Sequence, residues 1–91
     1  MALQSNKECY FCGTEQNLHR HHIYHGTSNR ANSEKYNMVV WLCYRHHNGS
    51  NEGVHFNRKL DLRLMMDAQR DFESNIGTRE DFRRIFGKSY L

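Results

Sequence analysis

All three cysteines of the chain lie in two short motifs, Cys9-Tyr10-Phe11-Cys12 and Cys43-Tyr44-Arg45-His46. Two motifs of this spacing supply four soft or borderline ligands, which is the set that tetrahedral zinc requires. Such a site is closed, so its zinc would stabilise the fold and take no part in catalysis. The expected zinc ligands are Cys9, Cys12, Cys43 and His46. Three ordinary buried thiols are the alternative interpretation.

The size and composition of the chain explain why a metal would help it fold. It has 91 residues, of which 37% are hydrophobic, and its mean hydropathy is −0.93. Domains of this size bury a marginal core and often recruit metals, disulfides or oligomerisation. We expect one domain over residues 1–91, with no leader and no membrane span. Three cysteines cannot all pair within one chain, so we expect a reducing cytosol, where spaced Cys and His indicate metal.

The hydrophobic pattern predicts two strands followed by two helices. A first strand is expected over Leu18 to Tyr24, and a second over Met38 to Leu42, which is β-branched and aromatic. The stretch from Gly26 to Asn37 is rich in Gly, Ser and Asn without an apolar period, which predicts a loop. From Asn57 to Ser74, apolar residues recur at helical steps, which predicts a long helix.

The apolar residues of this predicted long helix are Leu60, Leu64, Met65, Ala68 and Phe72, and we expect them to belong to the core. Gly77 is expected to end the helix. A short second helix is then predicted, with Thr78 as its N-cap, acidic residues in its first turn and Gly87 at its end.

Four of the seven histidines fall within Leu18 to Gly26, and they include the adjacent pair His21 and His22. Neighbouring residues on a strand point to opposite faces, so one ring can hold a metal while the other activates a water. If a helical turn begins near His46, then His47 faces away from the zinc. A divalent ion on His21 and His47 would keep open positions for a phosphate oxygen and for water, with His22 as general base. An exposed, solvated imidazole remains the alternative for any one of these histidines.

The motifs His21-His22-Ile23, Asn37 ahead of a strand, and Leu42-Cys43-x-x-His46-His47 resemble those of the HNH endonucleases of the ββα-metal (His-Me finger) superfamily. The small size and several later motifs look like those of the short HNH proteins of bacteriophages and prophages. These later motifs are Gly49, Val54-His55-Phe56, the Gln69-Arg70 helix and Phe86-Gly87-Lys88-x-Tyr90-Leu91. The resemblance covers the chain from about Cys9 to Leu91.

The resemblance implies an α+β fold: a small zinc-stapled ββα-metal core over about 9–56, in which a two-stranded antiparallel hairpin packs with a helix, and a helical extension over about 57–91. In this family pattern His21 and His47 are metal ligands and His22 is the general base. Asn37 braces the loop so that a backbone carbonyl orients His22, with Asn32 as a competitor. His55 is either a third ligand or a packing residue at the start of the long helix. The sequence departs from the pattern in that His46 stands where the family usually has Cys.

The function implied is a DNA endonuclease that hydrolyses phosphodiester bonds and leaves 5′-phosphate and 3′-hydroxyl ends. Mg²⁺ is the expected ion, and imidazole ligands also suit Mn²⁺, Ni²⁺ or Zn²⁺. The expected partner is DNA, with phage packaging or recombination proteins as further candidates, in the cytoplasm of a bacterial host. The alternatives are a catalytically inactive zinc-stapled module that binds DNA or assists assembly, and a zinc ribbon that contacts only proteins. Neither the oligomeric state nor the choice between nicking and double-strand cutting follows from the sequence.

A net charge of +3 and a sequence pI of about 8.9 are compatible with a polyanionic partner. The basic residues expected to contact DNA phosphates are Arg20, Arg30, Lys35 and Arg45. Each could equally be a solvated surface charge. We expect His19 near the site without contacting the metal, and His25 at the surface or on a phosphate.

Overall fold

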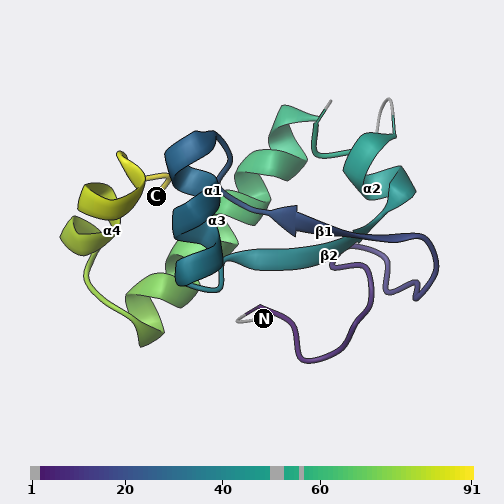
Figure 1. Ribbon diagram of the computed structural model, residues 1–91, viewed down its shortest axis with the longest axis horizontal. Coiled ribbons are helices and arrows are strands. Elements are labelled where there is room, and N and C mark those ends of the chain that lie inside the picture. The colour runs from purple at the N-terminus through teal and green to yellow at the C-terminus, as the bar shows by residue number, and fades with distance from the viewer. Residues whose placement is uncertain (1–2, 50–52, 56) are drawn as a thin grey trace.

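The structure, a computed structural model, describes residues 3–49, 53–55 and 57–91. It is a small α+β domain in which two antiparallel strands combine with helices (Figure 1). The elements are β1 (Leu18–His22), α1 (Thr27–Lys35), β2 (Val39–Cys43), α2 (Tyr44–Asn48), α3 (Arg58–Asn75) and α4 (Arg79–Phe86). The predicted strands and helices are confirmed to within two residues at each end. Phe56, part of one motif quoted above, lies outside the described residues.

The register of the sheet brings the two cysteine motifs to the same end. Leu18 pairs with Cys43 and His22 with Val39, so the start of β1 lies beside the end of β2. The N-terminal knuckle joins the other side of β2, where the backbone N–H of Tyr10 donates to the Trp41 carbonyl at 2.9 Å. The knuckle, the end of β2 and the first turn of α2 therefore meet at one place.

The predicted loop from Gly26 to Asn37 is wrong, because the structure contains helix α1 over Thr27–Lys35. Helix α1 has no apolar stripe from which it could be predicted from the sequence. Intrinsic helix propensity is only a weak guide, because tertiary contacts override it. Polar side chains hold it in place instead. Ser33 Oγ bonds to both the N–H and the carbonyl of Tyr24, Asn32 Nδ2 donates to the Ile85 carbonyl, and Asn29 Nδ2 donates to the Phe86 carbonyl.

The core lies between the sheet, α3 and α4, and it is rich in aromatic rings. Leu64, Met65, Ala68 and Phe72 of α3 are buried as predicted, whereas Leu60 is half-buried. The Tyr24 ring packs at a tilt against Phe86 with ring centroids 4.5 Å apart, and its hydroxyl donates to the Met65 carbonyl at 2.6 Å. Helix α2 lies at the opposite end of the molecule from α4 (Figure 1).

The ends of the long and short helices follow the expected capping chemistry. The Thr78 side chain accepts from the Asp81 N–H while the Asp81 carboxylate accepts from the Thr78 N–H, which is a capping box. Gly87 closes α4 in the left-handed conformation. No helix in the described part of the chain is both long and apolar enough to cross a membrane.

Candidate metal centres

Cys9, Cys12, Cys43 and His46 form a four-ligand cluster, as expected. The Cys12 and Cys43 sulfurs are 3.8 Å apart, and His46 Nδ1 lies 3.5 Å from Cys9 Sγ and 3.3 Å from Cys43 Sγ. A tetrahedral zinc with Zn–S near 2.3 Å and Zn–N near 2.05 Å places its ligands about 3.8 Å apart for S–S and about 3.5 Å for S–N. The cluster therefore has the dimensions of a zinc site, although its spacing does not identify the metal.

The thiols of this cluster lie in two electrostatic environments. Burial raises the pKa of Cys9, but hydrogen bonds from the backbone of Cys43, Cys12 and Phe11 outweigh it and bring that pKa to about 6. Burial raises the pKa of Cys43. Metal binding needs thiolates, so the low pKa of Cys9 favours the ligand form at neutral pH.

Gly13, at φ 78°, makes the turn between Cys9 and the following chain, and its N–H donates to the Cys9 carbonyl at 2.9 Å.

His21, His47 and His55 form a second cluster. His47 Nε2 lies 3.1 Å from His55 Nε2, and the ring centroid of His21 lies 5.2 Å from that of His47 and 5.5 Å from that of His55. Ligand nitrogens about 2.1 Å from one ion stand about 3.0 Å apart in an octahedron and about 3.4 Å apart in a tetrahedron. The two Nε2 atoms have the separation of neighbouring ligands.

His21 carries the clearest sign that this cluster suits a cation. Its side chain is 3% exposed, and its Nε2 is buried without a hydrogen-bond partner among the described residues. An unpaired buried nitrogen costs free energy unless something binds it. Burial, followed by the neighbouring His47 and His55, lowers the pKa of His21 to about 3. The ring is therefore neutral at pH 7, which is the form that coordinates a metal.

A short segment after α2 brings His55 to the cluster. The Val54 N–H donates to the His46 carbonyl at 2.8 Å, and the Gly53 N–H donates to the Gly49 carbonyl at 2.9 Å. A Cβ at Gly53 would lie 2.6 Å from the Gly49 nitrogen, so only glycine allows this approach. The His55 side chain is exposed and faces His47 rather than packing into the core.

His19 and His25 flank the second cluster. His19 lies on the same face of β1 as His21, two residues away, and its Nδ1 is 2.9 Å from His47 Nδ1. If His47 Nε2 binds an ion, His47 Nδ1 carries the proton and donates a hydrogen bond to His19 Nδ1, which holds the His47 ring in place. His25 is 45% exposed, and its Nε2 lies 3.5 Å from the buried carboxylate of Asp61.

His22 points to the other face of β1 and contacts a residue that the sequence analysis missed. Its Nε2 lies 2.6 Å from Glu34 Oε2 of α1, and Arg20 binds both carboxylate oxygens of Glu34, at 2.6 and 2.5 Å. The hydrogen bonds from Arg20 and His22 lower the pKa of Glu34 to about 2. Arg20 and His22 share a face at strand spacing, but the helix that supplies Glu34 was expected to be a loop. No local sequence pattern predicts the contact of Glu34 with His22.

The two asparagines considered for bracing the loop lie in different settings. Asn37 precedes β2 in the left-handed conformation, at φ 61°, and its side chain is exposed. Asn32 bonds to α4 through the Ile85 carbonyl. The contact that braces the chain after β1 comes from Ser33, whose buried hydroxyl donates to the Tyr24 carbonyl at 2.9 Å and accepts from its N–H at 3.1 Å.

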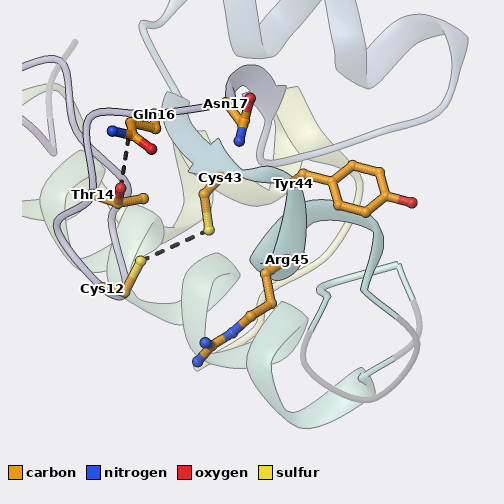
Figure 2. Close-up of a pocket in the computed structure, with 7 residues that line it drawn as sticks. All are labelled: Cys12, Thr14, Gln16, Asn17, Cys43, Tyr44 and Arg45. Atoms are coloured by element: carbon orange, nitrogen blue, oxygen red, sulfur yellow. Dashed lines mark hydrogen bonds between the residues drawn. The ribbon is translucent and has the colours of Figure 1, made fainter.

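The basic residues proposed for DNA contacts do not form one group. Arg20 is engaged by Glu34. Arg30 and Lys35 are exposed on α1, and the Lys35 ammonium lies 5.4 Å from the ring centroid of Tyr36. Arg45 is exposed on α2 and lines a cavity beside the first cluster (Figure 2).

Comparison with family models, with curated proteins and with solved structures found no match.

Proposed function

We propose that the chain is a metal-dependent DNA endonuclease of the HNH type. The observation that carries the proposal is the division of labour within one adjacent pair. His21 is buried in a three-imidazole cluster with an unpaired nitrogen, while His22 is on the other face of β1 and hydrogen-bonded to a carboxylate. A cation ligand next to an oriented base is the arrangement that metal-assisted hydrolysis needs.

His21, His47 and His55 are the proposed ligands of the catalytic ion. Three ligands are fewer than the coordination number of Mg²⁺ or Mn²⁺, so positions remain for a phosphate oxygen and water. When bound, the ion supplies Lewis-acid stabilisation of the charge that develops on the phosphate and on the departing 3′ oxygen. The four-ligand cluster around Cys43 is closed by comparison and is proposed to hold a structural zinc.

His22 is the proposed general base, and Glu34 orients it. A carboxylate accepts hydrogen bonds, so the proton of a neutral His22 sits on Nε2, 2.6 Å from Glu34 Oε2. Nδ1 is then the basic nitrogen that removes a proton from the attacking water. The carboxylate also stabilises the imidazolium that forms, which is the role of the acidic partner in other His-based sites. Arg20 keeps Glu34 in place through two hydrogen bonds.

A second candidate is a zinc-stapled DNA-binding or assembly module without catalysis. The favouring observation is the same contact of His22 Nε2 with Glu34, because an imidazole hydrogen-bonded to a carboxylate that Arg20 also binds can serve structure alone. In that case DNA binding survives without metal-dependent cutting. Phage packaging or recombination proteins are proposed partners only if the nuclease assignment holds.

The test is cleavage of supercoiled plasmid by zinc-loaded protein, with and without added Mg²⁺ or Mn²⁺. We expect conversion to nicked or linear DNA only with the added ion, and the new ends should accept a kinase label only after phosphatase treatment, because they carry 5′-phosphate. A matched His21→Ala protein should retain the zinc of the cysteine cluster and lose cleavage. Plasmid that stays intact with every divalent salt would reject the nuclease proposal and leave the DNA-binding or assembly module as the remaining candidate.

A further inference from the structure

We propose that Tyr44 and the cavity beside it bind an unpaired nucleobase, with the Tyr44 ring as the stacking surface. This inference deepens the proposed function and rests on DNA being the ligand of the chain. Among the residues that line the cavity, only Cys12 and Cys43 belong to a metal cluster.

The Tyr44 ring is an exposed apolar surface at the first position of α2. It is 59% exposed, more than any other large hydrophobic side chain in the described part of the protein. The backbone N–H of Tyr44 donates a hydrogen bond to the Asn17 carbonyl at 3.0 Å, which holds the backbone in place. Figure 2 shows the ring extending outward, away from Cys12 and Cys43. A solvent-facing aromatic ring is the kind of group on which nucleobases stack.

A cavity of about 340 Å³ lies at the base of this ring. Its polar lining comes from Thr14, Gln16, Asn17 and Arg45. Hydroxyl and amide groups can donate to and accept from the edges of a base, and a guanidinium can neutralise a phosphate. None of the residues that line the cavity is an aspartate or a glutamate. Cavities of this volume hold small ligands.

The Tyr44 ring lies close to the proposed catalytic ion site, with His19 between them. The Tyr44 ring meets the His19 ring edge to face, with centroids 6.1 Å apart. His19 in turn lies 2.9 Å, nitrogen to nitrogen, from the ion ligand His47. A strand bound at the second metal cluster can therefore also reach Tyr44, and this proximity to the cluster distinguishes Tyr44 from an isolated surface aromatic.

The geometry favours an unpaired base over a base pair. Stacking on a side chain requires a free base face, and the amides of Gln16 and Asn17, which line the cavity, can bond to the base edge that pairing covers. The chemical class of ligand is thus single-stranded DNA, or duplex with an unpaired nucleotide at a nick, flap or bubble. Fully paired duplex would use the phosphate contacts alone.

The experiment measures binding of fluorescent single-stranded and duplex oligonucleotides by anisotropy, with zinc-loaded protein and no added divalent ion. We expect Tyr44→Ala to weaken single-strand binding roughly tenfold, Tyr44→Phe to keep it, and duplex binding to change less than twofold. The control is Ile76→Ala, which removes a second exposed apolar side chain, 45% exposed, at the end of α3. In a Tyr44→Trp protein, single-stranded DNA should quench more fluorescence than in the wild type, whose only tryptophan is Trp41.

Three results would overturn the inference: single-strand binding by Tyr44→Ala within twofold of wild type, equal losses on single strand and duplex, or no single-strand binding by the wild type. The readout is independent of catalysis, so a protein that binds through Tyr44 but never cuts would reject the nuclease alone. A protein that cuts plasmid but ignores the Tyr44 substitutions would reject the stacking site alone.

Discussion

His46 and His47 are neighbours in the chain, yet their rings belong to different clusters. His46 Nδ1 lies 3.3 Å from Cys43 Sγ, whereas His47 Nε2 lies 3.1 Å from His55 Nε2. The cause is α2, which begins directly after Cys43 and turns successive side chains by about 100°. One short helix thus positions one histidine for each cluster, and we expect the integrity of the first cluster to control the second.

Loss of the first centre should therefore abolish both folding stability and function. We expect Cys12→Ser to lose one equivalent of zinc and its cooperative thermal transition, because structural zinc contributes on the order of 10 kcal/mol in small zinc domains, comparable with the whole stability of a domain. Zinc content and circular dichroism on heating measure this. Ser5→Ala, at an exposed position near the N-terminus, is the control. A Cys12→Ser protein that melts like wild type would show that the cysteines do not hold a structural metal.

The second centre should be separable from the first. His47→Ala and His55→Ala should each keep the zinc of the cysteine cluster and lose the second equivalent of metal in Mn²⁺ or Zn²⁺ titrations. His19→Ala should weaken that second equivalent by roughly 10- to 100-fold, as expected when a partner of a ligand histidine is removed. Isothermal titration calorimetry gives both stoichiometry and affinity. Unchanged binding in all three variants would mean that the three-imidazole cluster binds no ion.

Glu34 should affect the rate rather than substrate binding. Glu34→Gln keeps the shape of the side chain but removes the charge that stabilises the His22 imidazolium, so we expect kcat to fall roughly 10- to 100-fold, less than the 10²- to 10⁴-fold contribution of a general base. KM should stay within twofold. Glu80→Gln, an exposed acid in the first turn of α4, controls for the change in net charge. A loss confined to KM would assign Glu34 to DNA binding instead.

Acid should destabilise the protein through His21. Its folded-state pKa of about 3 is below the ordinary value of 6.5, so between these values the unfolded chain takes up a proton that the buried ring does not. Stability present above about pH 6.5 is then lost as the pH falls toward 3, by about 2 kcal/mol between pH 7 and pH 5. Urea unfolding of zinc-loaded wild type and His21→Phe at both pH values isolates this contribution. The same loss in both proteins would contradict the shift.

The sequence located the residues of the two clusters better than it located the polar helix beside them. Ligand types and spacings are local, so Cys9-x-x-Cys12, Cys43-x-x-His46 and the His21 face could be predicted. Period 2 also placed His19 beside the site. The polar helix α1 could not be predicted, because side-chain bonds from Asn29, Asn32 and Ser33 to distant backbone hold it, and no hydrophobic period records such bonds.

Missing α1 had a direct consequence for the candidate catalytic site. Glu34 approaches His22 only because α1 folds back over β1, so a pairing twelve residues apart in the chain had no local signature. The bracing role was assigned to Asn37, with Asn32 as competitor, on the strength of a resemblance alone. The structure gives the backbone contact after β1 to Ser33 and leaves the Asn37 side chain exposed. That assignment for Asn37 stays a prediction.

The central claim is that two adjacent imidazoles have different tasks, His21 as an ion ligand and His22 as a base. The most direct measurement is the single-turnover rate of plasmid nicking by wild-type and His22→Ala proteins in Mg²⁺ or Mn²⁺, with metal content measured on the same samples. The account predicts equal metal content and a rate at least roughly 100-fold lower for His22→Ala. Equal nicking rates, at equal metal content, would contradict it.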